Sequence, residues 1–254
     1  MELDLHYKQV VVVGGRQGIG LSIVKNFLRE GSVVHVISRT IDLSLVDDLE
    51  HRYTSRIFFY QADATLEESL FLAFKKILIN SNFKIDILIS NVGNGSGIVD
   101  YIPDEMEWEI SWNNNFKSAL NSVRVFSSII TECKGSITFI SSIAGIEHLG
   151  APVSYSTAKS ALNAFAKSLS YQFSPDVRVN VVAPGNIFIE NGVWHKKLNQ
   201  NSESVEKMLR DKVPLQRFGL PDEVSDLVVF ISSNRASFIT GACFVIDGGQ
   251  TVGY

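Results

Sequence analysis

The sequence predicts an α/β fold, a doubly wound parallel sheet of about seven strands with helices on both faces in three α/β/α layers. Short apolar runs alternate with longer amphipathic stretches along the whole chain. The runs are apolar on both faces, which is typical of strands buried between two helical layers. A glycine-rich turn follows the first run, and the strand–helix–strand order favours parallel pairing.

Each expected strand is a compact and largely apolar run. The strands are expected at residues 10–13, 33–37, 56–60, 85–89, 136–140, 177–182 and 242–246. Between them, apolar residues recur at helical spacing. The helices are expected at residues 19–30, 45–52, 66–80, 104–133, 152–173 and 221–232.

Residues 186–212 interrupt this rhythm because they are polar and weakly periodic, and they contain Asn191-Gly192. A segment of this length in a compact domain is usually a functional flap or a small helical insertion. We expect a substrate flap here, with a plain surface insertion as the alternative. Since no composition break marks a boundary, residues 1–254 are expected to form a single domain that contains this flap.

The composition excludes several classes of protein. Of the 254 residues, 45% are hydrophobic and 20% charged, which gives enough apolar surface to offset the entropy of ordering the chain. The 23 basic and 27 acidic residues give a net charge of −4, without the basic footprint of a nucleic-acid-binding protein. No apolar run approaches the ~18 residues of a membrane span, and the first residues have no signal-peptide pattern. We expect a soluble, cytoplasmic protein with neither nucleic acid nor a membrane as partner.

The two cysteines, Cys133 and Cys243, form neither the framework of a disulfide-rich protein nor a zinc-site pattern. One disulfide between them is arithmetically possible. We expect no metal site.

The first expected strand leads directly into Gly14-Gly15-Arg16-Gln17-Gly18-Ile19-Gly20, and a helix follows. In this position backbone N–H groups and the helix N-terminus face a pyrophosphate, and glycine permits its close approach. The spacing is GxxxGxG rather than GxGxxG, and no P-loop Lys-Ser/Thr pair follows. We expect a dinucleotide site that includes Gly14, Arg16, Gln17, Gly18 and Ile19. A tight strand–helix connection is the alternative.

The end of the second strand, Ser38-Arg39-Thr40, selects between the two nicotinamide cofactors. An acid here would bind the adenosine ribose 2′-hydroxyl of NAD(H) and repel a 2′-phosphate, but the first acid is Asp42. Arg39 offers a guanidinium fork to that phosphate, Ser38 a hydroxyl, and Arg16 a second cation. We therefore expect NADP(H) in preference to NAD(H), with a solvated Arg39 at the strand end as the alternative.

Tyr155 and Lys159 lie near the start of the helix expected at 152–173. Positions i and i+4 share one helix face, so the ammonium is expected near the phenol. A nearby positive charge lowers the pKa of a phenol from its usual value of ~10 and makes it usable as an acid–base group. A YxxxK spacing alone is weak evidence, and an ordinary helix face is the alternative.

In their order along the chain, these motifs resemble those of the short-chain dehydrogenase/reductase family, and the resemblance covers essentially the whole sequence. The glycine loop matches the family's cofactor loop, and Tyr155 and Lys159 match its catalytic pair. Further matches are Asp63-Ala64, Ser90-Asn91-Val92-Gly93, Asn115, Ser141-Ser142, Ala183-Pro184-Gly185 and Asp247-Gly248-Gly249. The sequence departs from the family's pattern at Val13, Ser90, Val92 and Ile189. These changes remove supporting hydrogen bonds but no proton-transfer group.

The resemblance implies a Rossmann-type fold and hydride transfer between NADP(H) and a carbonyl or secondary alcohol. It implies that Tyr155 is the general acid/base, that Ser142 stabilises charge on the substrate oxygen, and that Lys159 lowers the Tyr155 pKa and binds the nicotinamide ribose. Asn115 is implied to hold a relay water that links Lys159 to solvent. The implied cofactor-binding residues are Asp63, Ala64, Asn91, Gly93, Tyr155, Lys159, Pro184, Gly185 and Ile187. The family also implies a homodimer or homotetramer.

We expect a small-molecule substrate to meet the loops that follow the strands, together with the flap. The candidates for contact with it are Asn94, Glu147, His148, Asn186 and Trp194, with ordinary surface-loop positions as the alternative. An acyl group on an acidic carrier protein is disfavoured, because residues 131–134 and 174–176 are poor in basic charge. Two alternative functions stay open. One is an NAD(H)-dependent sugar or polyol dehydrogenase, and the other is a non-catalytic NADP(H)-sensing protein, which needs no proton-transfer residues.

Overall fold

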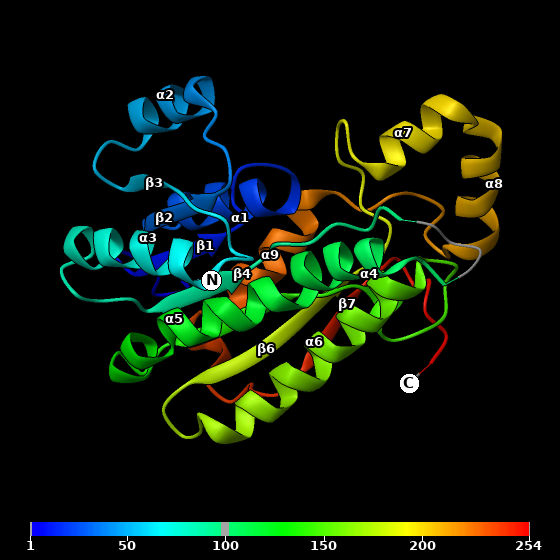
Figure 1. Ribbon diagram of the computed structural model, residues 1–254. Coiled ribbons are helices and arrows are strands. Elements are labelled where there is room, and N and C mark those ends of the chain that lie inside the picture. Colours follow the sequence, from blue (N-terminus) through cyan, green and yellow to red (C-terminus); the bar gives the residue numbers. More distant parts are fainter. Residues whose placement is uncertain (1, 98–101, 254) are drawn as a thin grey trace.

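A computed structural model describes residues 2–97 and 102–253 and confirms the predicted fold class. Its strands form one parallel sheet in the order β3-β2-β1-β4-β5-β6-β7 (Figure 1). The strands are β1 (Gln9–Val13), β2 (Val33–Ser38), β3 (Ile57–Gln61), β4 (Ile87–Ser90), β5 (Ser136–Ile140), β6 (Arg178–Pro184) and β7 (Cys243–Ile246).

The helices follow the alternating order that the sequence predicts. They are α1 (Gly18–Arg29), α2 (Leu43–Arg52), α3 (Glu67–Asn80), α4 (Glu105–Trp112), α5 (Ser118–Glu132), α6 (Val153–Gln172), α7 (Val193–Gln200), α8 (Ser202–Lys212) and α9 (Pro221–Ser232). The described residues also form three short turns: the π-helical η1 (Asn113–Lys117) and the 3₁₀ turns η2 (Ile143–Gly145) and η3 (Asn234–Ala236). Among the described residues, no helix is long and apolar enough to cross a membrane.

The central strand β1 shows why the strands are apolar on both faces. Val10 and Val12 belong to one hydrophobic core, in which α1 and α9 pack together, whereas Val11 and Val13 belong to a second core with residues of α3, α5 and α6. Val10, Val11, Val12 and Val13 are therefore all buried whichever way they point, because both faces of the sheet are covered at this strand (Figure 1).

Two segments differ from the sequence prediction in detail. The single helix expected at 104–133 is α4 and α5 joined by the π-helical turn η1, which carries Asn115. The polar segment 186–212 is largely helical and contains α7 and α8, which stand at one end of the molecule (Figure 1). Asn201 separates the two helices, and its side chain caps α8 by accepting a hydrogen bond from the Ser204 N–H at 3.0 Å.

Candidate active site

A cavity of about 740 Å³ lies where the central parallel strands end. Its walls come from the loops after β1, β2, β3 and β4 and from the start of α6. The chain crosses here from the β1–β3 half of the sheet to the β4–β7 half, and ligands of doubly wound sheets bind at such switch points. The cavity brings together these predicted site residues: Gly14, Arg16, Gln17, Gly18, Ile19, Ser38, Arg39, Asp63, Ala64, Asn91, Gly93, Asn94, Tyr155 and Lys159.

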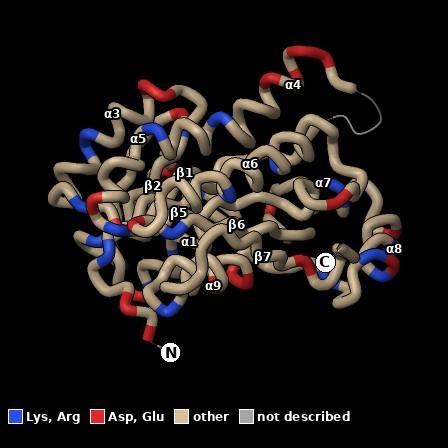
Figure 2. The backbone as a smooth tube through the Cα atoms, turned by 90° about the horizontal axis from the view of Figure 1, so that it is seen from below, with Lys and Arg blue, Asp and Glu red and all other residues tan. Residues whose placement is uncertain are grey.

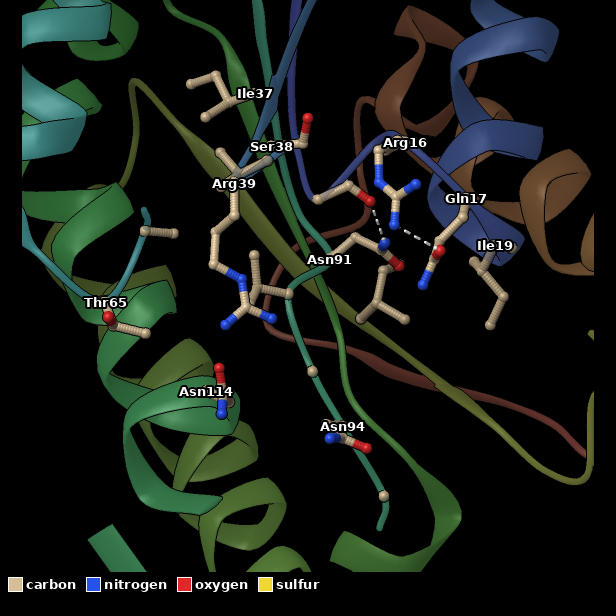
Figure 3. Close-up of a pocket in the computed structure, with 18 of the residues that line it drawn as sticks. Arg16, Gln17, Ile19, Ile37, Ser38, Arg39, Thr65, Asn91, Asn94 and Asn114 are labelled. Atoms are coloured by element: carbon tan, nitrogen blue, oxygen red, sulfur yellow. Dashed lines mark hydrogen bonds between the residues drawn. The ribbon is translucent and has the colours of Figure 1, made fainter. Parts of the chain in front are cut away.

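The glycine loop forms a cradle that side chains would fill. Gly14 has a φ of +88°, and Gly18 a φ of +55°, conformations that glycine adopts without strain. A Cβ on Gly20 would lie 2.1 Å from the Gly14 carbonyl oxygen and 2.5 Å from Nδ2 of Asn91. Asn91 donates to the same carbonyl at 2.8 Å and holds the loop against β4 (Figure 3). The loop therefore fits the close approach of a dinucleotide pyrophosphate to the backbone.

Two arginines line this cavity beside the ends of β1 and β2. The Arg16 guanidinium donates to Oε1 of Gln17 at 2.9 Å, and the exposed Arg39 side chain extends into the cavity from the end of β2 (Figure 3). Ser38 donates its hydroxyl hydrogen to the Thr40 carbonyl at 2.7 Å. Asp42 caps α2, and hydrogen bonds from Ser44 and Leu45, with a contribution from the Arg16 charge, lower its pKa.

The Asp63 carboxylate shapes the loop after β3. Its Oδ1 accepts hydrogen bonds from the backbone N–H of Thr65 at 2.9 Å and from its hydroxyl at 2.8 Å. Asn121, buried on α5, donates to the Ala64 carbonyl at 3.1 Å. The loop is therefore fixed from both sides at the rim of the cavity.

Tyr155 and Lys159 reach the cavity from the first turns of α6. The Lys159 ammonium donates to the Ile140 carbonyl at 2.9 Å and lies 5.9 Å from the centre of the Tyr155 ring. Burial lowers the pKa of Lys159 from 10.5 to about 8. Burial also raises the pKa of Tyr155, against a smaller opposing effect of its hydrogen bond with Ser142. This direction is opposite to the lowering that the Tyr–Lys pairing alone suggests, because desolvation of the phenol outweighs the stabilisation of its charged form.

Ser142 is placed by its own backbone. It precedes η2, and its hydroxyl oxygen accepts a hydrogen bond from the Ala144 N–H at 3.1 Å. The neighbouring Ser141 lines the cavity and donates to the Lys159 carbonyl at 3.3 Å, which ties the end of β5 to α6.

Asn115 is fully buried in η1, and its side chain bonds to the loop after β4. Its Oδ1 accepts from the Asn94 N–H at 2.9 Å, while its Nδ2 donates to the Asn94 carbonyl at 3.0 Å and to the Ser111 carbonyl at 2.9 Å. A Cβ on Gly93 would lie 2.9 Å from Nζ of Lys159 and 3.0 Å from Oδ1 of Asn115. Gly93 therefore leaves the space in which these two side chains converge.

Residues 184–187, at the start of the loop after β6, lie outside the cavity lining, whereas Ile189 and Gly192 farther along the same loop line it. Pro184 ends β6, and Gly185 donates its N–H to the Ile246 carbonyl at 2.9 Å. Ile187 pairs with Gly219, and its side chain is buried in the hydrophobic core.

The other substrate candidates lie in various environments outside the cavity lining. Asn186 donates to the Met208 sulfur at 3.5 Å, and Trp194 packs on Phe218 with 5.4 Å between ring centres. His148 is exposed. The Glu147 carboxylate accepts hydrogen bonds from backbone N–H groups near the end of the chain.

Further residues line the cavity that were not predicted as site residues, although Val13, Val92, Ser141 and Ile189 were named within the motifs. They are Val13, Ile37, Thr40, Ala62, Thr65, Val92, Gly95, Asn114, Ile140, Ser141, Ile189, Gly192 and Val193. Most are neighbours of predicted residues, so their proximity to the motifs was an available signal. Asn114 is different, because the π-helical turn sets the residue next to the buried Asn115 at the cavity wall (Figure 3). Among the described residues, no group of three or more His, Cys, Asp or Glu side chains is arranged to hold a metal ion.

Comparisons with known proteins agree with this geometry. A family model described as enoyl-(acyl carrier protein) reductase matches residues 13–251. The 3-oxoacyl-[acyl-carrier-protein] reductase FabG of Aquifex aeolicus is 32% identical over 257 residues, covering 98% of this chain and 100% of that protein. The tropinone reductase homolog At1g07440 of Arabidopsis thaliana is 33% identical over 260 residues, with 98% and 93% coverage.

Solved structures are similar over the full length. The structure of L-sorbose reductase from Gluconobacter frateurii, complexed with NADPH and L-sorbose, has a TM-score of 0.91 at 25% identity, with each chain covered at 100%. The structure of Cj0485 dehydrogenase has a TM-score of 0.90 at 28% identity and covers 98% of this chain and 96% of that one.

Proposed function

The chain belongs to the short-chain dehydrogenase/reductase family of hydride-transfer oxidoreductases, and we propose that it transfers a hydride between NADP(H) and a small carbonyl compound or secondary alcohol. The observation that carries this proposal is the cluster of half-buried Tyr155 and Ser142 with buried Lys159, beside a cavity with a glycine cradle. A non-catalytic sensor of the cofactor would need the cradle but not the cluster. The cluster therefore favours an enzyme.

The proposed mechanism assigns the proton to Tyr155. A bound nicotinamide supplies or accepts the hydride. The raised pKa of Tyr155 keeps its phenol protonated at neutral pH, so that it can donate to a carbonyl oxygen. Ser142, hydrogen-bonded to the phenol, stabilises negative charge on the same oxygen. The Lys159 ammonium, anchored on the Ile140 carbonyl, stabilises the phenolate left behind.

Asn115 completes the proposed set. Its side chain ties the loop after β4 to η1, beside Lys159. We assign to it the relay water through which Lys159 recovers protons from solvent. The remaining cofactor contacts are assigned to the glycine loop, Asp63, Ala64, Asn91, Gly93, Pro184, Gly185 and Ile187.

The cofactor preference rests on the end of β2. Arg39 projects into the cavity, Arg16 lies in the glycine loop, and the first acid, Asp42, is engaged in capping α2. Two cations without a competing carboxylate favour a ribose 2′-phosphate, and hence NADP(H) over NAD(H).

A small substrate is favoured over an acyl group on an acidic carrier protein. The start of α4 carries the carboxylates Asp104, Glu105 and Glu107 (Figure 2), and Glu107 lies near Gly97 and Pro152 at the start of α6. This charge would repel an acidic carrier that approached beside α6. Asn94, His148, Asn186 and Trp194 are proposed to contact the substrate, with α7 and α8 as the flap. We propose a cytoplasmic homodimer or homotetramer.

The test is a screen of ketones, ketoses, polyols and secondary alcohols with both nicotinamide cofactors, followed through nicotinamide absorbance. Tyr155→Phe should abolish turnover and leave cofactor binding intact, since only the hydroxyl is removed. Tyr171→Phe, at the exposed end of α6, is the matched control and should be fully active. Undiminished turnover of Tyr155→Phe would refute the mechanism.

A further inference from the structure

Glu147 bonds to a segment that lies more than a hundred residues away in the sequence. Its Oε1 accepts hydrogen bonds from the N–H of Val252 at 3.1 Å and of Gly253 at 2.5 Å, and its Oε2 lies 3.2 Å from the Val252 nitrogen. Glu147 is half-buried, whereas the side chain of Val252 is 87% exposed. The contact is therefore between a carboxylate and backbone donors, and it requires no particular side chain at 252.

We name residues 247–253 the C-terminal strap, because carboxylates hold it at both ends. At its start, Asp247 accepts from the N–H of Gly249 at 2.9 Å and of Thr251 at 2.7 Å. At its far end, Glu147 takes up the next two N–H groups along the chain. The strap lies at the end of the molecule where β6 and β7 end (red in Figure 1).

The strap connects the loop after β6 with the turn that follows β5. A Cβ on Gly185 would lie 2.6 Å from Cβ of Asp247, so the start of the strap packs on the loop after β6. Glu147, at the other end, follows Ser142 by five residues. Between these two residues, Gly145 donates its N–H to the Ser142 carbonyl at 3.0 Å, and Glu147 donates its own to the Ile143 carbonyl at 3.0 Å.

These bonds make Glu147 and Ser142 parts of one rigid turn. Charge-assisted hydrogen bonds are among the stronger contacts that a half-buried carboxylate makes. A carboxylate occupied by two backbone donors is also less available to bind a substrate hydroxyl. The contacts therefore favour a role in placing the turn over direct binding of the substrate.

We propose that Glu147 is a positioning residue that clamps the C-terminal strap to the turn after Ser142 and so fixes the substrate-side wall of the active site. This inference rests on the proposed function for its kinetic consequence but not for the clamp itself. Opening the clamp should let the wall move, which weakens binding of the carbonyl substrate and leaves the cofactor side of the cavity unaffected.

A double-mutant cycle tests the clamp from both of its sides. Glu147→Ala removes the acceptor, and Val252→Pro removes the N–H that both carboxylate oxygens accept, while Glu147 stays in place. Val252→Ala keeps that N–H and is the matched control. We expect each disrupting variant to raise KM for a carbonyl substrate by roughly three- to tenfold, the range for an ordinary hydrogen bond, because the clamp acts on substrate binding only through the wall that it holds. The value of kcat and the Kd for NADPH should change by less than about twofold.

The double variant should raise KM no further than Glu147→Ala alone, because Glu147→Ala already removes every bond of the clamp, including the one that Val252→Pro removes. Glu147→Gln keeps one acceptor oxygen, so its KM should lie between those of the native protein and Glu147→Ala. If Glu147 instead binds the substrate directly, Val252→Pro would leave KM unchanged. Glu147→Ala would then raise KM by the same factor in the Val252→Pro protein as in the native protein. That outcome would overturn the proposal.

A second readout is independent of activity. Hydrogen exchange of the Gly253 amide should become at least about tenfold faster in Glu147→Ala and stay unchanged in Val252→Ala, since the amide loses its acceptor. Unchanged exchange in Glu147→Ala would overturn the clamp even if the enzyme is active. Faster exchange in a protein that turns over no carbonyl or alcohol would uphold the clamp and refute the proposed function.

Discussion

Replacement of Arg39 by alanine should separate the two nicotinamide cofactors. The Arg39 guanidinium is exposed and extends into the cavity (Figure 3), while its backbone carbonyl accepts a hydrogen bond from Nε2 of Gln61 at 3.0 Å. Arg39→Ala keeps that backbone bond and removes only the charged fork. The variant therefore isolates the contribution of the guanidinium to binding of a ribose 2′-phosphate.

The expected size of the effect follows from the exposure of Arg39. A hydrogen bond to a charged group contributes about 1.5–3 kcal/mol, and a guanidinium can make two such bonds to one phosphate. Solvent and salt screen an exposed pair, so we count only one bond of this strength. The Kd for NADPH should rise by roughly 10- to 100-fold. The Kd for NADH should change by less than about twofold, because a 2′-hydroxyl carries no charge.

Both values come from one titration that follows the fluorescence of the reduced nicotinamide, which is the same group in the two cofactors. The Kd of Arg39→Lys for NADPH should lie between those of the native protein and Arg39→Ala, since lysine keeps the charge but lacks the forked guanidinium group. Arg29→Ala, at the exposed end of α1, is the matched control and should bind both cofactors normally. Equal weakening of NADPH and NADH in Arg39→Ala would refute the assignment of the 2′-phosphate to this residue.

Gly93→Ala should lower kcat at least tenfold, because the new Cβ would lie 2.9 Å from Nζ of Lys159 and 3.0 Å from Oδ1 of Asn115. Gly95→Ala is the control and should be active, because the nearest atom to its Cβ would be 3.6 Å away. Equal activity of these two variants would contradict the crowding argument. Carbonyl reduction should fall as the pH rises through about 8, where buried Lys159 loses its charge. A profile of kcat against pH that is flat up to pH 10 would exclude a role of the Lys159 charge in the reaction. Because burial lowers the pKa of His35 from 6.5 to about 4, the protonated unfolded state is favoured in acid. The contribution of neutral His35 to the free energy of unfolding is complete above pH 6.5 and falls by up to about 3 kcal/mol toward pH 4. Urea unfolding at pH 7 and at pH 5 should show this loss. In His35→Gln the difference between the two pH values should be smaller.

The strands could be predicted because burial between two helical layers requires apolar side chains on both faces of a strand. An apolar run indicates burial, however, and does not show which residues form hydrogen bonds with a neighbouring strand. Ile85 was included in the fourth expected strand because it is apolar, and it is fully buried, yet it precedes the paired residues of β4. The expected and observed strand ends differ by one or two residues in six of the seven strands, and burial beyond the ladder explains the case of Ile85.

The proposed site could be predicted as far as its contacts are local. The glycine loop and the Tyr155–Lys159 spacing lie within single strand–helix units, and both line the cavity. The π-helical turn at Asn115 could not be predicted, because it accompanies bonds to the backbone of Asn94, on another element. The contact of Glu147 with the strap is missing from the sequence pattern for the same reason, since any residue but proline offers a backbone N–H.

The desolvation of the Tyr155 phenol and the Lys159 ammonium bears on the direction of the proposed reaction. Burial raises the pKa of the phenol and lowers that of the ammonium, so each group considered alone resists ionisation. A phenolate formed beside a charged Lys159 is compensated within the same site, and the Ile140 carbonyl holds Nζ in place for it at 2.9 Å. At neutral pH the phenol is thus protonated while the ammonium is still charged. That is the state from which a proton is donated to a carbonyl, whereas alcohol oxidation first requires the phenolate. The buried pair therefore favours carbonyl reduction at neutral pH.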